Sequence, residues 1–179
     1  PNFLEAQGRA KVSRAKADLR STATALESYF VDNNNYPIES SDIGAFYLEY
    51  IKALSTPVAY LTSTTMLDPF MPENFQNWED YRGSYSYMTF NGPFLAPYYP
   101  DYRRKVVSVI SFGPDRVDSH GNYFPYFYEH PEKGLNATYH GLWPAPAYEY
   151  MMYDSSNGTV SAGDVIRVCG EATCPQAVP

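Results

Sequence analysis

The first thirty-seven residues constrain the fold most, because they hold a long helical pattern that ends at a sharp stop. Apolar side chains recur every three or four positions over residues 12–30, which places them on one face of a helix. This apolar stripe consists of Val12, Ala15, Leu19, Ala23, Leu26 and Phe30. Residues 32–35 are turn formers, and Tyr36 precedes Pro37, where helical backbone is disfavoured. The pattern predicts a helix over residues 2–31 whose apolar stripe docks on a sheet.

The length of this helix and the composition of the chain limit the architecture further. A helix over residues 2–31 is roughly 45 Å long, more than a compact head of this size requires, so we expect part of it to protrude. With 179 residues, 44% of them apolar, the chain has enough material for one core. Its net charge of −7 argues against nucleic acid as a partner, because phosphate binding requires clustered Lys and Arg.

The rest of the chain carries strand patterns rather than a second long helix. A short helical stretch is expected over residues 45–54, and residues 55–83 contain three prolines and are typical of irregular structure. Four runs rich in β-branched and aromatic residues predict strands. They are residues 84–91, 105–112, 148–153 and 165–169. The second run is the expected central strand, and a helix followed by strands favours an α+β fold.

Several segments of the sequence resemble type IV pilins and the major pseudopilins of type II secretion, in the order in which those families carry them. The segments are Pro1-Asn2-Phe3-Leu4, Asp32-Asn33-Asn34-Asn35-Tyr36-Pro37, Leu67-Asp68-Pro69-Phe70, Ser111-Phe112-Gly113-Pro114-Asp115 and Gly163-Asp164-Val165-Ile166. The resemblance implies a pilin-like α+β fold, in which a long amphipathic N-terminal helix packs on an antiparallel sheet. It divides a single domain into a stem helix (1–31), a globular head (37–115 and 148–179) and a loop-rich insertion (116–147).

The resemblance also implies a function by assembly rather than catalysis. A pilin-like chain is a structural subunit of a helical filament whose partners are copies of itself and other pilins or pseudopilins. About twenty apolar residues are expected before Pro1, enough to hold the subunit in the inner membrane before it enters a periplasmic or extracellular filament. Phe3, Ala6 and Ala10 form a seam for neighbouring stems, and the basic residues over 9–20 can pair with acidic heads of neighbours. Whether the filament is a pilus or a pseudopilus stays open.

The resemblance places a calcium site at two of the segments. In major pseudopilins the equivalents of Asp115 and Asp164 hold Ca²⁺ with carboxylates and backbone carbonyls, and Asp118 is a candidate for a further ligand. Calcium requires six to eight oxygen ligands. The family usually carries adjacent acids before the Ile, whereas Gly163 occupies the earlier position here. The alternative is that Asp115 and Asp164 only cap turns beside glycines.

The two cysteines, Cys169 and Cys174, favour a disulfide, because an even count in a cell-envelope protein is usually paired. Two free thiols are the alternative. The small ring between them would constrain only the C-terminus, since the entropic effect of a crosslink grows with loop length.

The insertion is dense in aromatic residues, which often mark contact surfaces. The surface candidates are Tyr123, Phe124, Tyr126, Phe127 and Tyr128. They could pack subunits in a filament, bind sugars by stacking, or form a local core under a long loop. Sugar binding would make the chain an adhesin or glycan-binding subunit on the same stem. An enzyme is the least supported class, because Ser111, Asp115 and His120 are close only in sequence and lack a nucleophile elbow.

Overall fold

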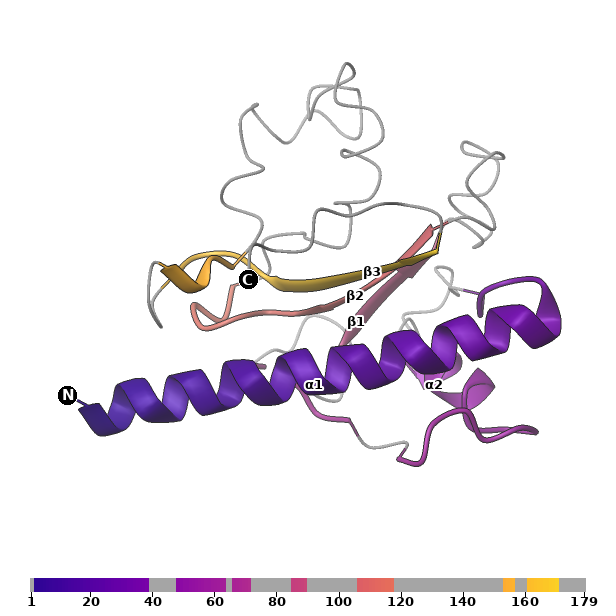
Figure 1. Ribbon diagram of the computed structural model, residues 1–179, viewed down its shortest axis with the longest axis horizontal. Coiled ribbons are helices and arrows are strands. Elements are labelled where there is room, and N and C mark those ends of the chain that lie inside the picture. The colour runs from indigo at the N-terminus through magenta and orange to yellow at the C-terminus, as the bar shows by residue number, and fades with distance from the viewer. Residues whose placement is uncertain are drawn as a thin grey trace, which may run out of the picture.

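The computed structural model describes residues 2–38, 48–63, 66–71, 85–89, 106–117, 153–156 and 161–170. Two helices and three strands follow one another along these residues (Figure 1). They are α1 (Asn2–Asn33), α2 (Leu48–Ala53), β1 (Ser86–Thr89), β2 (Val106–Ser111) and β3 (Val165–Gly170). The predicted α+β class is confirmed: α1 lies across a small antiparallel sheet.

Helix α1 ends at Asn33, two residues beyond the predicted end. Asn34 has a φ of 50°, and its N–H donates to the Phe30 carbonyl at 2.7 Å, which is a left-handed cap. The Asn33 side chain also donates to the Tyr29 carbonyl at 2.9 Å. Asparagine tolerates the left-handed region better than most residues, so the turn formers extend the helix before Pro37 stops it.

The sheet has the order β1-β2-β3, and both pairings are antiparallel. Val109 pairs with Tyr87 on one side and with Arg167 on the other, which makes β2 the central strand, as predicted. Successive residues of β2 from Val107 to Ile110 are at most 1% exposed. Because neighbouring residues of a strand point to opposite faces, β2 is buried on both faces of the sheet.

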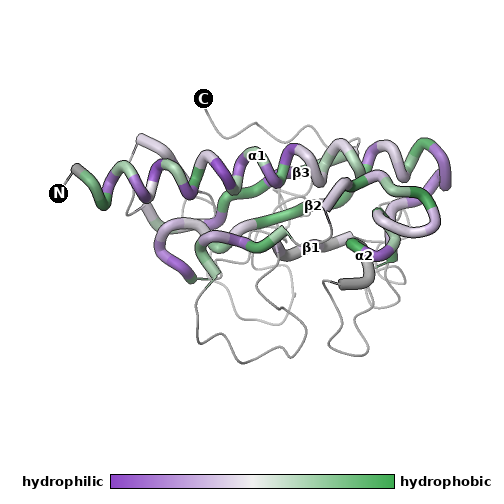
Figure 2. The backbone as a smooth tube through the Cα atoms, turned by 90° about the horizontal axis from the view of Figure 1, so that it is seen from below, coloured by the Kyte–Doolittle hydropathy of each residue, from purple (hydrophilic) through white to green (hydrophobic). Residues whose placement is uncertain are grey.

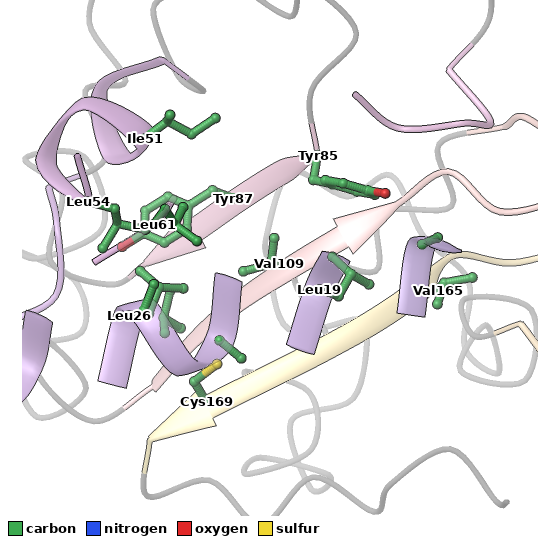
Figure 3. Packing of buried hydrophobic residues seen from close by; sticks show 14 of the residues in the cluster. Leu19, Leu26, Ile51, Leu54, Leu61, Tyr85, Tyr87, Val109, Val165 and Cys169 are labelled. Atoms are coloured by element: carbon green, nitrogen blue, oxygen red, sulfur yellow. The ribbon is translucent and has the colours of Figure 1, made fainter. Parts of the chain in front are cut away.

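The apolar stripe of α1 packs on this sheet, as the sequence predicts. Ala15 and Leu26 are fully buried, Leu19 is nearly so, and Figure 3 shows Leu19 and Leu26 beside sheet residues such as Val109 and Val165. Phe30 is partly buried, packs against the same core, and lies 4.8 Å from the Tyr36 ring. The first buried residue of α1 is Val12, so the turns before it project from the head (Figure 1).

Two carboxylates of α1 fix its position by hydrogen bonds to the sheet region. Asp18 accepts from the Tyr85 hydroxyl at 2.7 Å, at the start of β1. Glu27 accepts from the Gly170 N–H at 2.8 Å, at the end of β3, and from the Tyr36 hydroxyl at 3.1 Å. The helix is therefore tied to both edge strands of the described sheet.

The structure describes only part of each remaining predicted element. Helix α2 lies inside the predicted 45–54 stretch, of which residues 45–47 lie outside the described residues. In the predicted strand 148–153, residues 148–152 lie outside them too. Tyr153 is not in a strand, although its N–H donates to the Asp164 carbonyl at 2.9 Å beside β3. Within the described part of the chain, no helix has the length and hydrophobicity of a membrane span.

Replacing Tyr85 with Phe should destabilise the fold at neutral pH and remove one source of alkaline sensitivity. The variant loses the hydrogen bond to Asp18, worth about 1 kcal/mol. Burial and the Asp18 carboxylate raise the pKa of Tyr85, so the folded state keeps a proton that the unfolded state releases above about pH 10. The advantage of the wild type over Y85F should be complete below pH 10 and shrink above it. Urea unfolding at pH 7 and pH 11 measures both differences, and an unchanged gap at pH 11 would contradict the assignment.

Candidate functional site

The segments that resemble pseudopilins meet at one end of the sheet, although they are far apart in sequence. We call this region the motif junction; it comprises residues 66–71, 111–117 and 161–164. Backbone N–H groups donate hydrogen bonds to side-chain carboxylates across its three segments and so join them.

Asp68 is the buried centre of the first contact in the motif junction. It is 5% exposed, and its Oδ1 accepts from the Phe70 N–H at 2.9 Å, which closes an Asx turn across Pro69. The same oxygen accepts from the Ser111 hydroxyl at 2.8 Å, and Oδ2 accepts from the Phe112 N–H at 2.9 Å. Burial raises the pKa of the Asp68 carboxyl, while these three donors favour its ionised form. Asp68 therefore anchors the 66–71 segment to the end of β2.

The turn after β2 makes the second contact. Gly113 has a φ of 72°, and a Cβ at this position would lie 2.3 Å from the Gly163 carbonyl oxygen, so only glycine fits. Asp115 spans the same gap: its Oδ2 accepts from the Gly163 N–H at 3.0 Å and its Oδ1 from the Val117 N–H at 3.2 Å. The turn that contains Gly113 and the segment that contains Gly163 are therefore in direct contact.

Asp164 and Ser161 complete the motif junction on the β3 side. The Asp164 side chain is 1% exposed. Its backbone carbonyl accepts from the Tyr153 N–H at 2.9 Å, and the Ser161 hydroxyl accepts from the Asp154 N–H at 3.3 Å. Residues 153–154 are therefore held alongside the segment that leads into β3.

One family model resembles the N-terminal part of the chain. Residues 2–77 match the family model of the type II secretion system (T2SS), protein G. The N-terminal part of the chain is therefore similar to the major pseudopilins of type II secretion. No curated protein and no solved structure matches it. The match covers less than half of the chain, spanning α1, α2 and the Asp68 segment, and it ends before β1.

The predicted calcium ligands are brought together in part. Asp115 and Asp164 lie in adjoining segments of the motif junction, whereas Asp118 lies outside the described residues. Both Asp115 oxygens accept backbone hydrogen bonds, which is the turn-capping arrangement. No group of three His, Cys, Asp or Glu side chains in the described ranges could hold a metal ion. Two carboxylates do not complete a calcium shell, so the site stays a prediction that depends on Asp118 and backbone carbonyls.

The other predicted site residues fall into two groups. Phe3, Ala6 and Ala10 are exposed on the projecting turns of α1, where a seam requires them to be. Cys169 is buried in the core beneath α1, and burial raises the pKa of its thiol to about 12, so it stays protonated at neutral pH. Its predicted partner Cys174 lies outside the described residues, and the disulfide stays a prediction. The aromatic candidates at 123, 124 and 126–128 lie outside them as well.

Sequence reasoning did not identify the roles of Asp68, Asp18 and Glu27. Asp68 was part of a recognised segment, and the Asp-Pro pair at 68–69 is the local signal of an Asx turn. The Ser111 hydroxyl donates to Asp68 from a fully buried position, which gives it a structural role in place of the nucleophile considered from sequence.

Replacing Asp68 with Asn should destabilise the fold by about 1–3 kcal/mol. The two oxygens of Asp68 accept three hydrogen bonds. The amide of the variant keeps one acceptor oxygen, but its NH₂ group replaces the other and faces a donor that then lacks an acceptor. Asp154→Asn is the matched control, because the exposed Asp154 uses one oxygen to accept from the Ser156 N–H at 2.7 Å in a comparable turn. Urea unfolding measures both variants, and equal stabilities for D68N and D154N would contradict the anchoring role.

Proposed function

We propose that this protein is a structural subunit of a type II secretion pseudopilus that acts by self-assembly rather than by catalysis. The proposal is supported by the match of residues 2–77 to the T2SS protein G family. The observation that carries the proposal is that the two faces of α1 differ. One face is buried against the sheet from Val12 onward, and the opposite face is exposed along the whole helix. An ordinary surface helix exposes charged and polar residues on this side, whereas α1 exposes a line of small residues.

The free face of α1 is suited to close packing against other helices. Its exposed residues are small and recur every three or four positions, so they form a continuous line along the helix. This small-residue face consists of Ala6, Ala10, Ser13, Ala17, Ser21, Thr24 and Ser28. Because the distance between packed helices depends on the side chains at the contact, small residues allow a neighbouring stem to approach closely. The seam predicted at Phe3, Ala6 and Ala10 is the N-terminal end of this face.

The proposal includes the partners and the location of the protein. Its partners are further copies of itself and other pseudopilins, with the basic residues over 9–20 pairing with acidic heads of neighbours. The subunit resides in the cell envelope, held in the inner membrane by an apolar segment before Pro1 until it enters the filament. The adhesin alternative depends on the 116–147 insertion, of which residues 118–147 lie outside the described residues, and no observation favours it.

A substitution on the small-residue face should block assembly without unfolding the subunit. Ala10→Trp puts a large side chain where a neighbouring stem packs, and overpacking of this kind lowers filament yield by about tenfold or more. Because Ala10 is exposed, the melting temperature of the isolated chain should not change. The yield is measured in filaments sheared from cells that carry the full-length gene.

Ile38→Trp is the control for this experiment, because Ile38 is also exposed, at 58%, but lies beyond the end of α1. The control should assemble normally. Normal filaments from A10W, or equal loss in both variants, would contradict assembly through the small-residue face.

We also propose that Ca²⁺ binds at the motif junction through Asp115, Asp164 and Asp118. Millimolar Ca²⁺ should then raise the melting temperature, because a ligand that binds only the folded state stabilises it by mass action. Asp118→Asn should abolish this rise while leaving the stability in EDTA unchanged within about 0.5 kcal/mol. A melting temperature that does not respond to Ca²⁺ would remove the site and leave Asp115 as a turn cap.

A further inference from the structure

One edge of the sheet lies open beside α1. Among the described strands, β3 has a neighbour on one side only. The side chains at its centre, Ile166, Arg167 and Val168, are partly exposed, whereas their partners in β2 are buried. Helix α1 packs mainly against β3, the strand drawn next to it in Figure 2. The open edge of β3 therefore runs along one flank of α1.

The hydrogen bonds at the two ends of β3 show which of its backbone groups face this open edge. The Asp164 carbonyl accepts from a neighbouring loop at 2.9 Å, and the Gly170 N–H donates to Glu27 at 2.8 Å, so both groups point away from β2. Backbone groups alternate in direction along an antiparallel strand, so those of Ile166 and Val168 also point away from β2. No described backbone group pairs with them on that side. Both residues can pair with an added strand.

Two cations of α1 lie over the same edge. Lys16, Arg20 and Glu27 are four and seven positions apart, so they share one flank of the helix. Lys16 Nζ lies 5.8 Å from the centre of the Tyr153 ring, at the start of β3, and Glu27 bonds to the end of that strand. Arg20 lies between these two contacts, along the middle of β3.

Arg167 adds a third cation from the strand itself. It alternates along β3 with Val165 and Cys169, which are buried beneath α1, so all three side chains start on the helix side of the sheet (Figure 3). The Nε atom of Arg167 is buried without a hydrogen-bond partner. Among the described residues, no carboxylate forms an ion pair with Lys16, Arg20 or Arg167. The open edge is therefore bordered by positive charge that the described part of the fold does not neutralise.

We propose that the open edge of β3 binds an extended acidic segment of another protein, which joins the sheet as an added strand. The backbone of the segment pairs with Ile166 and Val168, and its carboxylates pair with Arg20 and Arg167 on the helix side. Backbone pairing at a sheet edge provides affinity, and alternate side chains provide specificity. Side chains on the other face of the segment meet those of Ile166 and Val168, so the partner alternates acidic and apolar residues.

The described strands of a second copy do not fit this description of the partner. Strand β1 reads Ser-Tyr-Met-Thr and has no charged side chain, and the only charged residue of β3 is Arg167, itself a cation. Pairing with either strand would leave the cations of the open edge without an acceptor. The inference does not rest on the proposed pseudopilus, because the edge and its cations belong to one chain.

Binding of a synthetic peptide tests the proposal. The edge from Asp164 to Gly170 is about 20 Å long at 3.3 Å per residue, so a peptide of about seven residues covers it. The probe is an acetylated, fluorescently labelled peptide in which Asp and Val alternate. It is titrated with the 179-residue chain, and fluorescence anisotropy measures binding. The peptide should bind more weakly as salt rises, and a peptide with Lys in place of Asp should not bind.

Three variants locate the site. Arg167→Gln should weaken binding about tenfold, the effect of one charged hydrogen bond. Arg20→Gln should weaken it about threefold, as an exposed ion pair does, and its exposed position leaves the melting temperature unchanged. Arg14→Gln is the matched control, because it removes the same charge from the other flank of α1, beside Asp18 and β1. This control should bind like the wild type. If R167Q proves unfolded in the melting measurement, R20Q decides.

A peptide with every amide N-methylated separates strand addition from attraction between charges. It keeps the carboxylates but cannot donate hydrogen bonds to the edge, so its binding should be lost. With the unmodified peptide, amide hydrogen exchange should slow at Ile166 and Val168. Equal binding of the methylated peptide, equal weakening by R14Q and R20Q, or no binding of the Asp-Val peptide would overturn the proposal. Self-association that R20Q abolishes, without peptide binding, would overturn it in favour of a second copy.

Discussion

The packing of α1 across the sheet is the contact on which the rest of the structure depends. Ala15 and Ala23 leave little bulk between helix and strands, while Leu19 and Leu26 fill the space that remains (Figure 3). Tyr85 and Glu27 then fix the helix by hydrogen bonds at the two edges of the sheet. Because this layer positions the stem, it also decides which face of α1 is left for other molecules. The proposed assembly face follows from that one alignment.

The features that sequence predicted well are those that repeat locally. The three-to-four residue spacing of the stripe identified the buried face of α1, and the run before Pro37 located its end within two residues. The β-branched run in β2 likewise indicated the central strand of the sheet. Each of these follows from the geometry of a single element, in which neighbours in space are neighbours in sequence.

The features that sequence did not predict are pairings between distant residues. Glu27 and Gly170 are 143 residues apart, Tyr85 and Asp18 are 67 apart, and Ser111 and Asp68 are 43 apart. A carboxylate looks the same in sequence whether it is solvated on a helix or accepts a buried N–H. The resemblance placed Asp115 beside Asp164 and included Asp68 in one of its segments. Only the folded chain shows that Asp68 and Asp115 each use both carboxylate oxygens to join these segments.

The close approach of Gly113 and Gly163 has a consequence for how this fold accommodates variation in length. The Asp115 carboxylate clamps the two segments together, so the chain between them is a closed loop with fixed ends. The entropic penalty for closing a loop grows only with the logarithm of its length, and doubling the loop adds about 0.6 kcal/mol. Residues can therefore be added between the two glycines at little expense in stability. The fold can host a long sequence there, such as the aromatic one in this chain, while the stem and sheet stay as they are.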